Sequence, residues 1–324
     1  MVRRWTGAAG AVLLALHGSA PAQVPAGYPG RPVTIIVPFS AGSGIDLLAR
    51  SFAARLAERW SGSVVVDNRA GASANIGHEL AAAAAPNGYT LLLTAATFVT
   101  NAAVNRAQRY DPEKSFAPVL LIATGTQSLV VPAGSPARSV KELVQLAKEQ
   151  PGKLNYGSPG NGTPHHLVME LFKLEAGMDI LHVPYKGFAG ALTDLMAGRV
   201  EMMVMPVSAV AQYVQSGRVR VLAVMAPERS PVFPAVPTLA QEGYPGVEAS
   251  NWYALLAPAG TPAAIIAKLN ADLNALLEDA SVRDALAKQG FLPAGGGPER
   301  LSAQLRAESG RWRRIVDQAK IRAD

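Results

Sequence analysis

The sequence has no cysteine among its 324 residues. This absence excludes disulfide bonds, thiolate metal sites, a cysteine nucleophile and a lipid-modified cysteine at a mature N-terminus. Aromatic residues make up only 6% of the chain and charged residues only 17%. The hydrophobic fraction of 49% is nevertheless normal for a globular protein and too high for a disordered one. The length is enough for about two lobes, each with its own core.

Basic residues outnumber acidic ones by 30 to 24, but they are scattered along the chain. No run of Lys or Arg exceeds two residues, and no aromatic ladder accompanies them. Because nucleic-acid binding needs a clustered basic footprint, we expect no nucleic-acid partner. No segment after the N-terminus offers the 18 consecutive apolar residues typical of a membrane-spanning helix, so the mature chain is expected to be soluble.

The first 22 residues have the pattern of a secretory signal peptide. Arg3 and Arg4 form a positive n-region, Ala8–Leu16 is a short apolar core, and Ala20–Ala22 ends in small residues. We expect cleavage before Gln23 and, in a bacterium, a periplasmic protein. The alternative is a disordered cytosolic N-terminus.

Hydrophobic patterns predict strands that alternate with helices. Short apolar and β-branched runs predict strands at residues 32–39, 63–67, 89–94, 119–131, 154–157, 182–185, 200–205, 219–225 and 248–257. Helical spacing predicts helices at residues 46–60, 73–85, 139–149, 164–175, 189–197, 265–277, 281–289 and 299–322, the last packed on the first lobe. Strand–loop–helix alternation is typical of parallel strands with crossover helices, so the predicted fold class is α/β.

Two of the predicted strands, residues 119–131 and 248–257, are long and have a polar centre. We interpret them as the two crossings of a hinge. This predicts a first lobe from residues 23–124 and 248–324 and a second lobe from residues 125–247. Trp252 and Tyr253 in the return crossing either belong to the core or line a cleft, whereas Met202, Met203 and Met205 are expected to fill the core.

A loop of small residues, Phe39-Ser40-Ala41-Gly42-Ser43-Gly44-Ile45-Asp46, joins the first strand to the first helix. Its backbone can turn tightly and expose N–H groups, and the helix adds the positive end of its dipole, so the loop suits an anion. Asp46 can cap the helix. The alternative is an ordinary turn with no ligand. The dinucleotide fingerprint is absent because Leu47 stands where its third glycine belongs.

A second loop of this kind, Gly157-Ser158-Pro159-Gly160-Asn161-Gly162-Thr163, precedes a helix of the other lobe. Gly157 and Gly162 have the spacing of a phosphate-binding loop, but Thr163 replaces its lysine and Pro164 follows, which argues against a nucleoside triphosphate. Two anion-ready helix starts, one on each lobe and facing across a cleft, would hold a small acid.

The sequence offers little support for an enzyme or a metal site. His165 and His166 precede Glu170 without the H-E-x-x-H spacing or a third ligand, so we expect one histidine to pack or cap and the other to be exposed. Ser43 and Ser158 lack the flanking glycines of a nucleophile elbow. His182 has no evident acidic partner, although a triad from distant residues stays open. We therefore predict no catalytic residue, no metal and no cofactor.

Several segments resemble the Bug family, the periplasmic solute-binding proteins of tripartite tricarboxylate transporters. The resemblance covers nearly the whole mature chain and does not depend on one motif. The segments that carry it are Tyr28–Phe39, Asp67–Ala72, Asn87–Leu92, Tyr110–Val119, His182–Gly187, Pro237–Gly243 and Trp252–Pro262.

This resemblance implies a two-lobed Venus-flytrap fold that closes on a small carboxylate. It also implies recognition by backbone amides, hydroxyls and ordered water, a transient integral-membrane permease partner, and a monomer. Carried over by position, it places ligand contacts in four loops, two on each lobe. The implied residues are Phe39, Ser40, Ala41, Gly42, Ser43, Gly44, Asp46, Thr94, Ala95 and Thr97 in the first lobe, and Ser158, Gly160, Asn161, Gly162, Thr163, Tyr185 and Lys186 in the second.

The first loop departs from the family pattern Ala-Pro-Gly-Gly-Gly-Thr-Asp. Ala41 replaces the proline, Ser43 the middle glycine and Ile45 the threonine. Ser43 adds a hydroxyl, while Ile45 removes one and is expected to make the rim more apolar. We therefore expect a bulkier or less polar acid than the commonest ligands. Two alternatives stay open, a ligand-sensing partner of a membrane sensor kinase and a periplasmic hydrolase or transferase.

Overall fold

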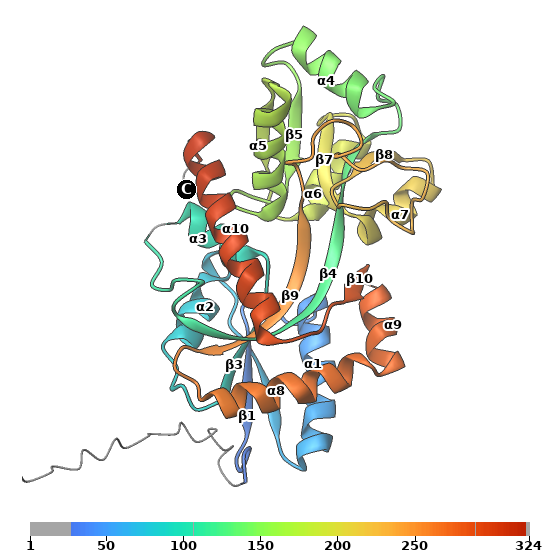
Figure 1. Ribbon diagram of the computed structural model, residues 1–324. Coiled ribbons are helices and arrows are strands. Elements are labelled where there is room, and N and C mark those ends of the chain that lie inside the picture. Colours follow the sequence, from blue (N-terminus) through green and yellow to red (C-terminus); the bar gives the residue numbers. More distant parts are fainter. Residues whose placement is uncertain (1–26, 106, 289, 322–324) are drawn as a thin grey trace, which may run out of the picture.

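The computed structural model in Figure 1 describes residues 27–105, 107–288 and 290–321. The chain is an α/β protein of the two-lobed Venus-flytrap type. The lobes are joined by the long strand β4 (Phe116–Pro132) and by the segment that leads into β9 (Ser250–Pro258). The predicted signal peptide and its cleavage site lie outside the described residues.

The sheet of the first lobe has its parallel strands on one side and its antiparallel strands on the other. Its order is β2 (Val64–Asn68), β1 (Val33–Val37), β3 (Thr90–Ala95), β9 and β4, with the short β10 (Phe291–Pro293) also on β4. Helices α1 (Gly44–Trp60), α8 (Ala263–Leu277) and α9 (Ala280–Lys288) cover one face. The other face is covered by the 3-10 turn η1 (Ala72–Ala74) and by helices α2 (Asn75–Ala82), α3 (Thr97–Val104) and α10 (Pro298–Gln318).

The sheet of the second lobe also mixes parallel and antiparallel pairs. Strand β5 (Asn155–Ser158) is parallel to β6 (Leu181–Pro184) and β7 (Met202–Pro206), whereas β4 is antiparallel to β7 and to β8 (Val219–Val224). Helices α6 (Phe188–Met196) and α7 (Val207–Gln215) contribute to the core on one face. Helices α4 (Val140–Glu149) and α5 (Pro164–Ala176) contribute to the core on the other.

Strand β4 belongs to both sheets. From Phe116 to Thr126 it pairs with β9, and from Gln127 to Pro132 it pairs with β7 and β8. The partners change between Thr126 and Gln127, two residues after the predicted boundary at residues 124–125. The division into residues 23–124 with 248–324 and residues 125–247 stays a prediction.

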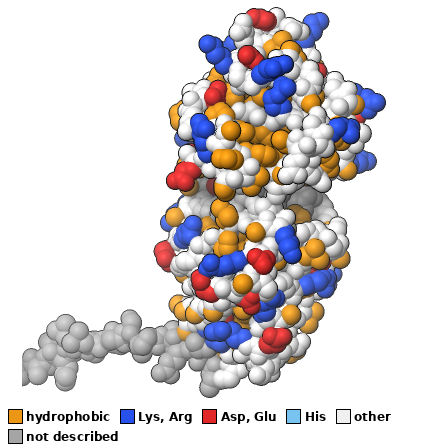
Figure 2. All heavy atoms as spheres, turned by 90° about the vertical axis from the view of Figure 1, so that its right-hand side faces the viewer, with side chains coloured by type: hydrophobic (Ala, Val, Ile, Leu, Met, Phe, Trp, Pro, Cys, Tyr) orange, Lys and Arg blue, Asp and Glu red, His pale blue; other side chains and the backbone are white. Residues whose placement is uncertain are grey.

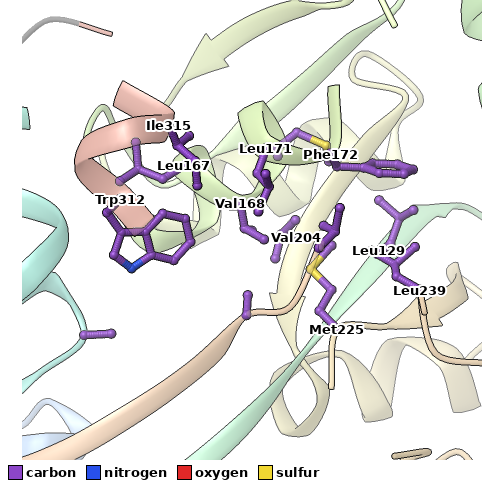
Figure 3. Packing of buried hydrophobic residues seen from close by; sticks show 14 of the residues in the cluster. Leu129, Leu167, Val168, Leu171, Phe172, Val204, Met225, Leu239, Trp312 and Ile315 are labelled. Carbon is purple, nitrogen blue, oxygen red and sulfur yellow. The ribbon is translucent and has the colours of Figure 1, made fainter. Parts of the chain in front are cut away.

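The buried hydrophobic residues show on which face the lobes can separate. One core runs through both lobes and includes residues of α3, α5 and α10. Trp312 and Ile315 of α10 lie beside Leu167 of α5 (Figure 3). The core under α1 and α8 is confined to the first lobe, and the core under α6 and α7 to the second. The lobes are therefore tied together on the α10 face, and the prediction that the last helix packs on the first lobe was incomplete.

The alternation of strands and helices was predicted well, but three elements were missed. These are α3, α7 and β10. Strand β4 begins three residues earlier than expected, and the predicted helix at residues 73–85 is divided into η1 and α2.

The two aromatic residues of the return crossing belong to the core. The Trp252 indole donates to the Glu308 carboxylate at 3.0 and 3.1 Å, and Tyr253 stacks on Phe291 at 4.2 Å. The three methionines of β7 are buried, as predicted.

The outer surface agrees with the dispersed charge pattern of the sequence. In Figure 2, Lys and Arg side chains are spread over both lobes rather than gathered in one continuous patch. Among residues 27–105, 107–288 and 290–321, no helix is both long and apolar enough to cross a membrane.

Gly290 provides a test of how the lobes approach each other. It precedes β10 in the first lobe and has a φ of +73°, and a Cβ there would overlap the Ser208 side chain of α7 in the second lobe. We expect Gly290→Ala to hold the lobes further apart and to raise the radius of gyration in solution scattering. Gly217→Ala is the matched control, since Gly217 has a φ of +65° and open space around it. Both variants carry about 1 kcal/mol of left-handed strain, so identical scattering would contradict the prediction.

Candidate functional site

The predicted site residues form two groups, one on the edge of each sheet. The parallel strands β1 and β3 end at the same edge of the first sheet, and their following loops carry Phe39–Gly44 and Thr97. Strands β5 and β6 likewise end together, and their loops carry Ser158–Thr163 and Tyr185–Lys186. The second group comes close to the first lobe at Gly162, where an added Cβ would lie 3.6 Å from Val104 of α3.

Asp46 holds the first loop from below. Its side chain is 1% exposed, and its carboxylate accepts hydrogen bonds from the Gly42 N–H at 2.7 Å, the Arg50 Nε at 3.0 Å and the Asn68 Nδ2 at 2.9 Å. Asn68 also donates to the Phe39 carbonyl. Burial opposes ionisation of this carboxyl, but the three donors outweigh burial and lower the pKa of Asp46 below its usual value. Asp46 therefore shapes the loop and has little capacity left for a ligand.

Among the predicted site residues of the first lobe, two hydroxyls are buried without a partner in the part of the chain that the structure describes. These are Ser43 Oγ, at the N-cap of α1, and Thr97 Oγ1, in the first turn of α3. Helix starts also leave their first N–H groups unbonded. A buried hydroxyl without a partner costs free energy, so both are positions at which a ligand oxygen would be favourable.

Three other first-loop and strand-end residues have structural roles in this state. Thr94 is fully buried, and its hydroxyl lies 2.8 Å from His78 Nε2. Burial lowers the pKa of His78 to about 3, so this histidine is neutral. Ala95 pairs with Tyr253 of β9. Ile45 is buried in the core of the first lobe, so the expectation that it makes the rim more apolar was wrong.

The second loop already uses its own backbone donors. The Gly160 N–H donates to Ser158 Oγ, the Thr163 N–H to the Gly160 carbonyl, and the Gly162 N–H to His166 Nδ1 at 3.1 Å. Thr163 is the N-cap of α5 and accepts from the His166 N–H. The loop is therefore preformed, and three of its amides are not free in this structure.

Histidines support this loop to an extent that the sequence did not indicate. His165 and His166 are both buried, so the expectation that one is exposed was wrong. The largely apolar sequence of α5 could have shown this, because consecutive residues from Pro164 to Phe172 are buried. His182 Nε2 lies 2.7 Å from Ser158 Oγ.

The two predicted residues of the β6–α6 turn lie in different environments. Tyr185 donates to Asp194 of α6 at 2.7 Å, and its own backbone N–H donates to the Ser158 carbonyl. Burial raises the pKa of Tyr185 to about 12, so the phenol stays a neutral donor. Lys186 is exposed.

A small cavity between the lobes involves residues that the sequence did not suggest. It has a volume of about 240 Å³. Its lining is uncharged and includes several amides: Ala72, Ser73, Asn75, Asn101, Val104, Asn105, Asn161 and Gly162. The backbone at Ala72, Ser73 and Ala74 has positive φ, which is a strained arrangement for residues other than glycine. Prediction of helix α3 could have revealed Asn101 and Val104, whereas no pattern in the sequence marks Ser73 and Asn75 as lining residues.

A larger cavity of about 440 Å³ lies at the hinge, between the crossing strands and α10. Its lining includes Thr124 and Thr126 of β4 and Glu308 and Arg311 of α10. Among the described parts of the chain, no group of three or more His, Asp or Glu side chains is arranged to hold a metal ion.

The two lobes, the shared strand and the paired polar loops define a solute-binding protein of the periplasmic type. A family model described as the tripartite tricarboxylate transporter family receptor, TctC, matches residues 48–321. The chain belongs to this receptor family, and its resemblance to the Bug proteins is confirmed.

Three relatives illustrate the similarity. Protein BugT of Bordetella pertussis (strain Tohama I) is 36% identical, over 89% of this chain and 89% of BugT. The structure of R. palustris Rpa4515 with adipate is 38% identical, with a TM-score of 0.78 over 91% of this chain and 99% of that chain. MatC from Rhodopseudomonas palustris with bound malate is 30% identical, with a TM-score of 0.75 over 89% of this chain and 99% of that chain.

Replacement of Asp46 tests its role beneath the first loop. Asp46→Asn removes the charge that Arg50 faces and weakens the bond to Gly42, so we expect a loss of about 1–3 kcal/mol in unfolding free energy at pH 7. Because the folded-state pKa is lowered, the ionised carboxylate stabilises the protein above pH about 4, and this contribution disappears as the pH falls through the lowered pKa.

Urea unfolding at pH 7 and pH 3 measures both effects. The variant should lose less stability than the unmodified protein between these pH values. Asp67→Asn is the control, because its ion pair with Arg69 is half-exposed and worth at most about 1 kcal/mol. Equal losses for the two variants would contradict the assignment of Asp46.

Proposed function

We propose that this protein captures a small dicarboxylate between its lobes and delivers it to an integral-membrane permease of the tripartite tricarboxylate type. The observation that carries the proposal is the pair of polar loop groups at the strand ends of the two sheets, one on each lobe, with Gly162 of the second group close to Val104 of the first lobe. The adipate and malate in the names of two relatives support an acid ligand. The proposal includes a periplasmic location after removal of residues 1–22, and action as a monomer.

The proposed recognition relies on neutral donors. The basic residue nearest the first loop, Arg50, is already bonded to Asp46 and Asn68. The unpartnered hydroxyls of Ser43 and Thr97 and the first N–H groups of α1 are the polar groups that remain for a carboxylate. Several hydrogen bonds to a charged ligand, at about 1.5–3 kcal/mol each, are enough for micromolar capture after the costs of closure.

Among linear acids, we favour adipate-like ligands over short hydroxy acids. Rpa4515, named with adipate, is more similar to this chain than MatC, named with malate. The uncharged cavity beside Asn161 and Gly162 also provides room next to the second loop.

The proposed role is capture without chemical change. Ser158 and His182 have the spacing of a serine–histidine pair, but the Ser158 side chain is fully buried and therefore not accessible to a substrate. We expect adipate to be recovered unchanged by mass spectrometry after long incubation. The appearance of a product would favour a hydrolase or transferase.

Ligand-induced stabilisation is the direct test. Adipate at 100 times its dissociation constant should raise the unfolding free energy by about 2.7 kcal/mol. A thermal-shift screen with adipate, malate, succinate and the monocarboxylate hexanoate measures this. We expect the dicarboxylates to raise the melting temperature more than hexanoate does. If no carboxylate produces a shift, the proposal is wrong.

The Thr97 hydroxyl can be tested with an almost isosteric change. We expect Thr97→Val to weaken adipate binding by roughly tenfold, the value of about one hydrogen bond to a charged group, with little change in stability. Thr100→Val on the same helix is the control, because the Thr100 hydroxyl is also unpartnered but the whole residue is buried, whereas Thr97 is partly exposed. Titration calorimetry should show a loss for the Thr97 variant alone, and equal affinity in both variants would remove Thr97 from the site.

A further inference from the structure

Two histidines are stacked directly behind the second loop. The rings of His166, from α5, and His182, from β6, have centroids 4.0 Å apart and planes only 9° from parallel. The Tyr156 ring of β5 is also nearly parallel to His182, at 4.7 Å. The pair therefore lies within packed surroundings and has little freedom to reorient.

Each histidine holds one end of the loop. His182 Nε2 lies 2.7 Å from the Ser158 hydroxyl, where the loop leaves β5. His166 Nδ1 accepts the Gly162 N–H at 3.1 Å, just before α5 begins. The four residues between β5 and the helix cap are thus fixed from behind at both ends.

The bond from Gly162 determines the protonation state of His166. A backbone N–H only donates, so His166 Nδ1 must carry a lone pair, and the ring must be neutral with its proton on Nε2. Protonation of Nδ1 would break this bond. Two charged rings at a centroid distance of 4.0 Å would also repel each other.

Charged groups near the histidine pair form bonds with their own neighbours. On α5, Lys173 bonds to Glu170, and Glu170 accepts the Tyr156 hydroxyl at 2.5 Å. The other titratable or charged groups on the neighbouring elements are His165 and Glu175 on α5, Tyr185 and Lys186 after β6, Glu201 before β7, and Glu299, Arg300, Arg306, Glu308, Arg311, Arg313, Arg314 and Asp317 on α10. Helix α3, which faces α5, carries none.

We propose that His166 and His182 are positioning residues that keep the second loop in the shape required for ligand capture, and that this function needs a neutral His166. The inference rests on the proposed function. Protonation of His166 Nδ1 would release the Gly162 N–H, so acidification should weaken capture.

Adipate titrations between pH 8 and pH 5 test the proposal. We expect the dissociation constant of the unmodified protein to rise about five- to tenfold over this interval, the effect of one lost backbone hydrogen bond. His166→Asn keeps an acceptor near the position of Nδ1 but does not titrate, so it should bind at pH 8 like the unmodified protein and show a flatter profile. Comparison at each pH cancels the protonation of adipate itself.

His165→Phe is the matched control. His165 is buried beside His166, but its ring contacts Phe188 and makes no hydrogen bond among the described residues. Burial lowers the pKa of His165 to about 4, so it does not titrate in this interval. Its variant should keep the full pH dependence. His166→Phe removes the acceptor and should weaken binding at every pH.

Different experimental outcomes would contradict the histidine proposal and the proposed function. Tighter binding at pH 5, or the same profile in His166→Asn as in the unmodified protein, would overturn the proposal. Failure of the unmodified protein to bind adipate at any pH would count against the proposed function instead. In that case nitrogen NMR of the ligand-free protein still tests His166, since the proposal requires its Nε2–H tautomer at pH 8 and loss of that tautomer on acidification.

Discussion

Backbone pairing along β4 is the constraint on which the rest of the structure depends. One strand supplies hydrogen-bond partners to β9 and β10 in the first lobe and to β7 and β8 in the second. Buried backbone groups must be paired, so neither sheet can detach from this strand without losing its own ladder. Any relative motion of the lobes must therefore occur as bending near Thr126 and Gln127, where the partners change.

Helix α10 restricts this bending to one face. Its residues pack against α3 of the first lobe and α5 of the second. At the hinge, Glu308 accepts N–H groups from Trp252 of β9, from Trp312 and from Gln304. Burial raises the pKa of Glu308 despite these donors. A polar network buried so completely specifies one arrangement of helix and strand, so the α10 face stays closed while the face lined by α1, α6 and α7 is the one able to open.

The sequence predicted the elements whose local pattern and burial agree. Strand β1 is a β-branched run buried on both faces, and α5 opens with Thr163 as its cap and Pro164 in its first turn. Helix α3 was missed because Thr97–Val104 has no charged residue to mark an exposed face, and five of its eight residues are β-branched or Asn, which are weak helix formers. Strand β10 has only three residues and exists because β4 offers an unpaired edge.

The candidate site was likewise predicted only in part. The positions of both loops followed from glycines before predicted helices. Their internal hydrogen bonds did not, because the partners of Ser158 and Gly162 are histidines 24 and 4 residues away whose geometry depends on tertiary packing. Ile45 was assigned to the rim because sequence shows its neighbours but not its orientation. The first turn of a helix has a side that faces the core, and Ile45 lies on that side, packed in the core under α1.

The two lobes differ in the hydrogen-bond donors that they offer to a ligand. In the first lobe, Asp46 fixes the loop from below and leaves the hydroxyls of Ser43 and Thr97 and the start of α1 without partners. In the second lobe, the amides of Gly160, Gly162 and Thr163 are already bonded within the loop. On the proposed function, an acid meets the unpartnered donors of the first lobe, and the second lobe contributes a preformed loop whose amides at Gly160, Gly162 and Thr163 are already bonded. Since hydrogen bonds to a charged ligand strengthen as water leaves, binding and closure favour each other without a salt bridge in the site.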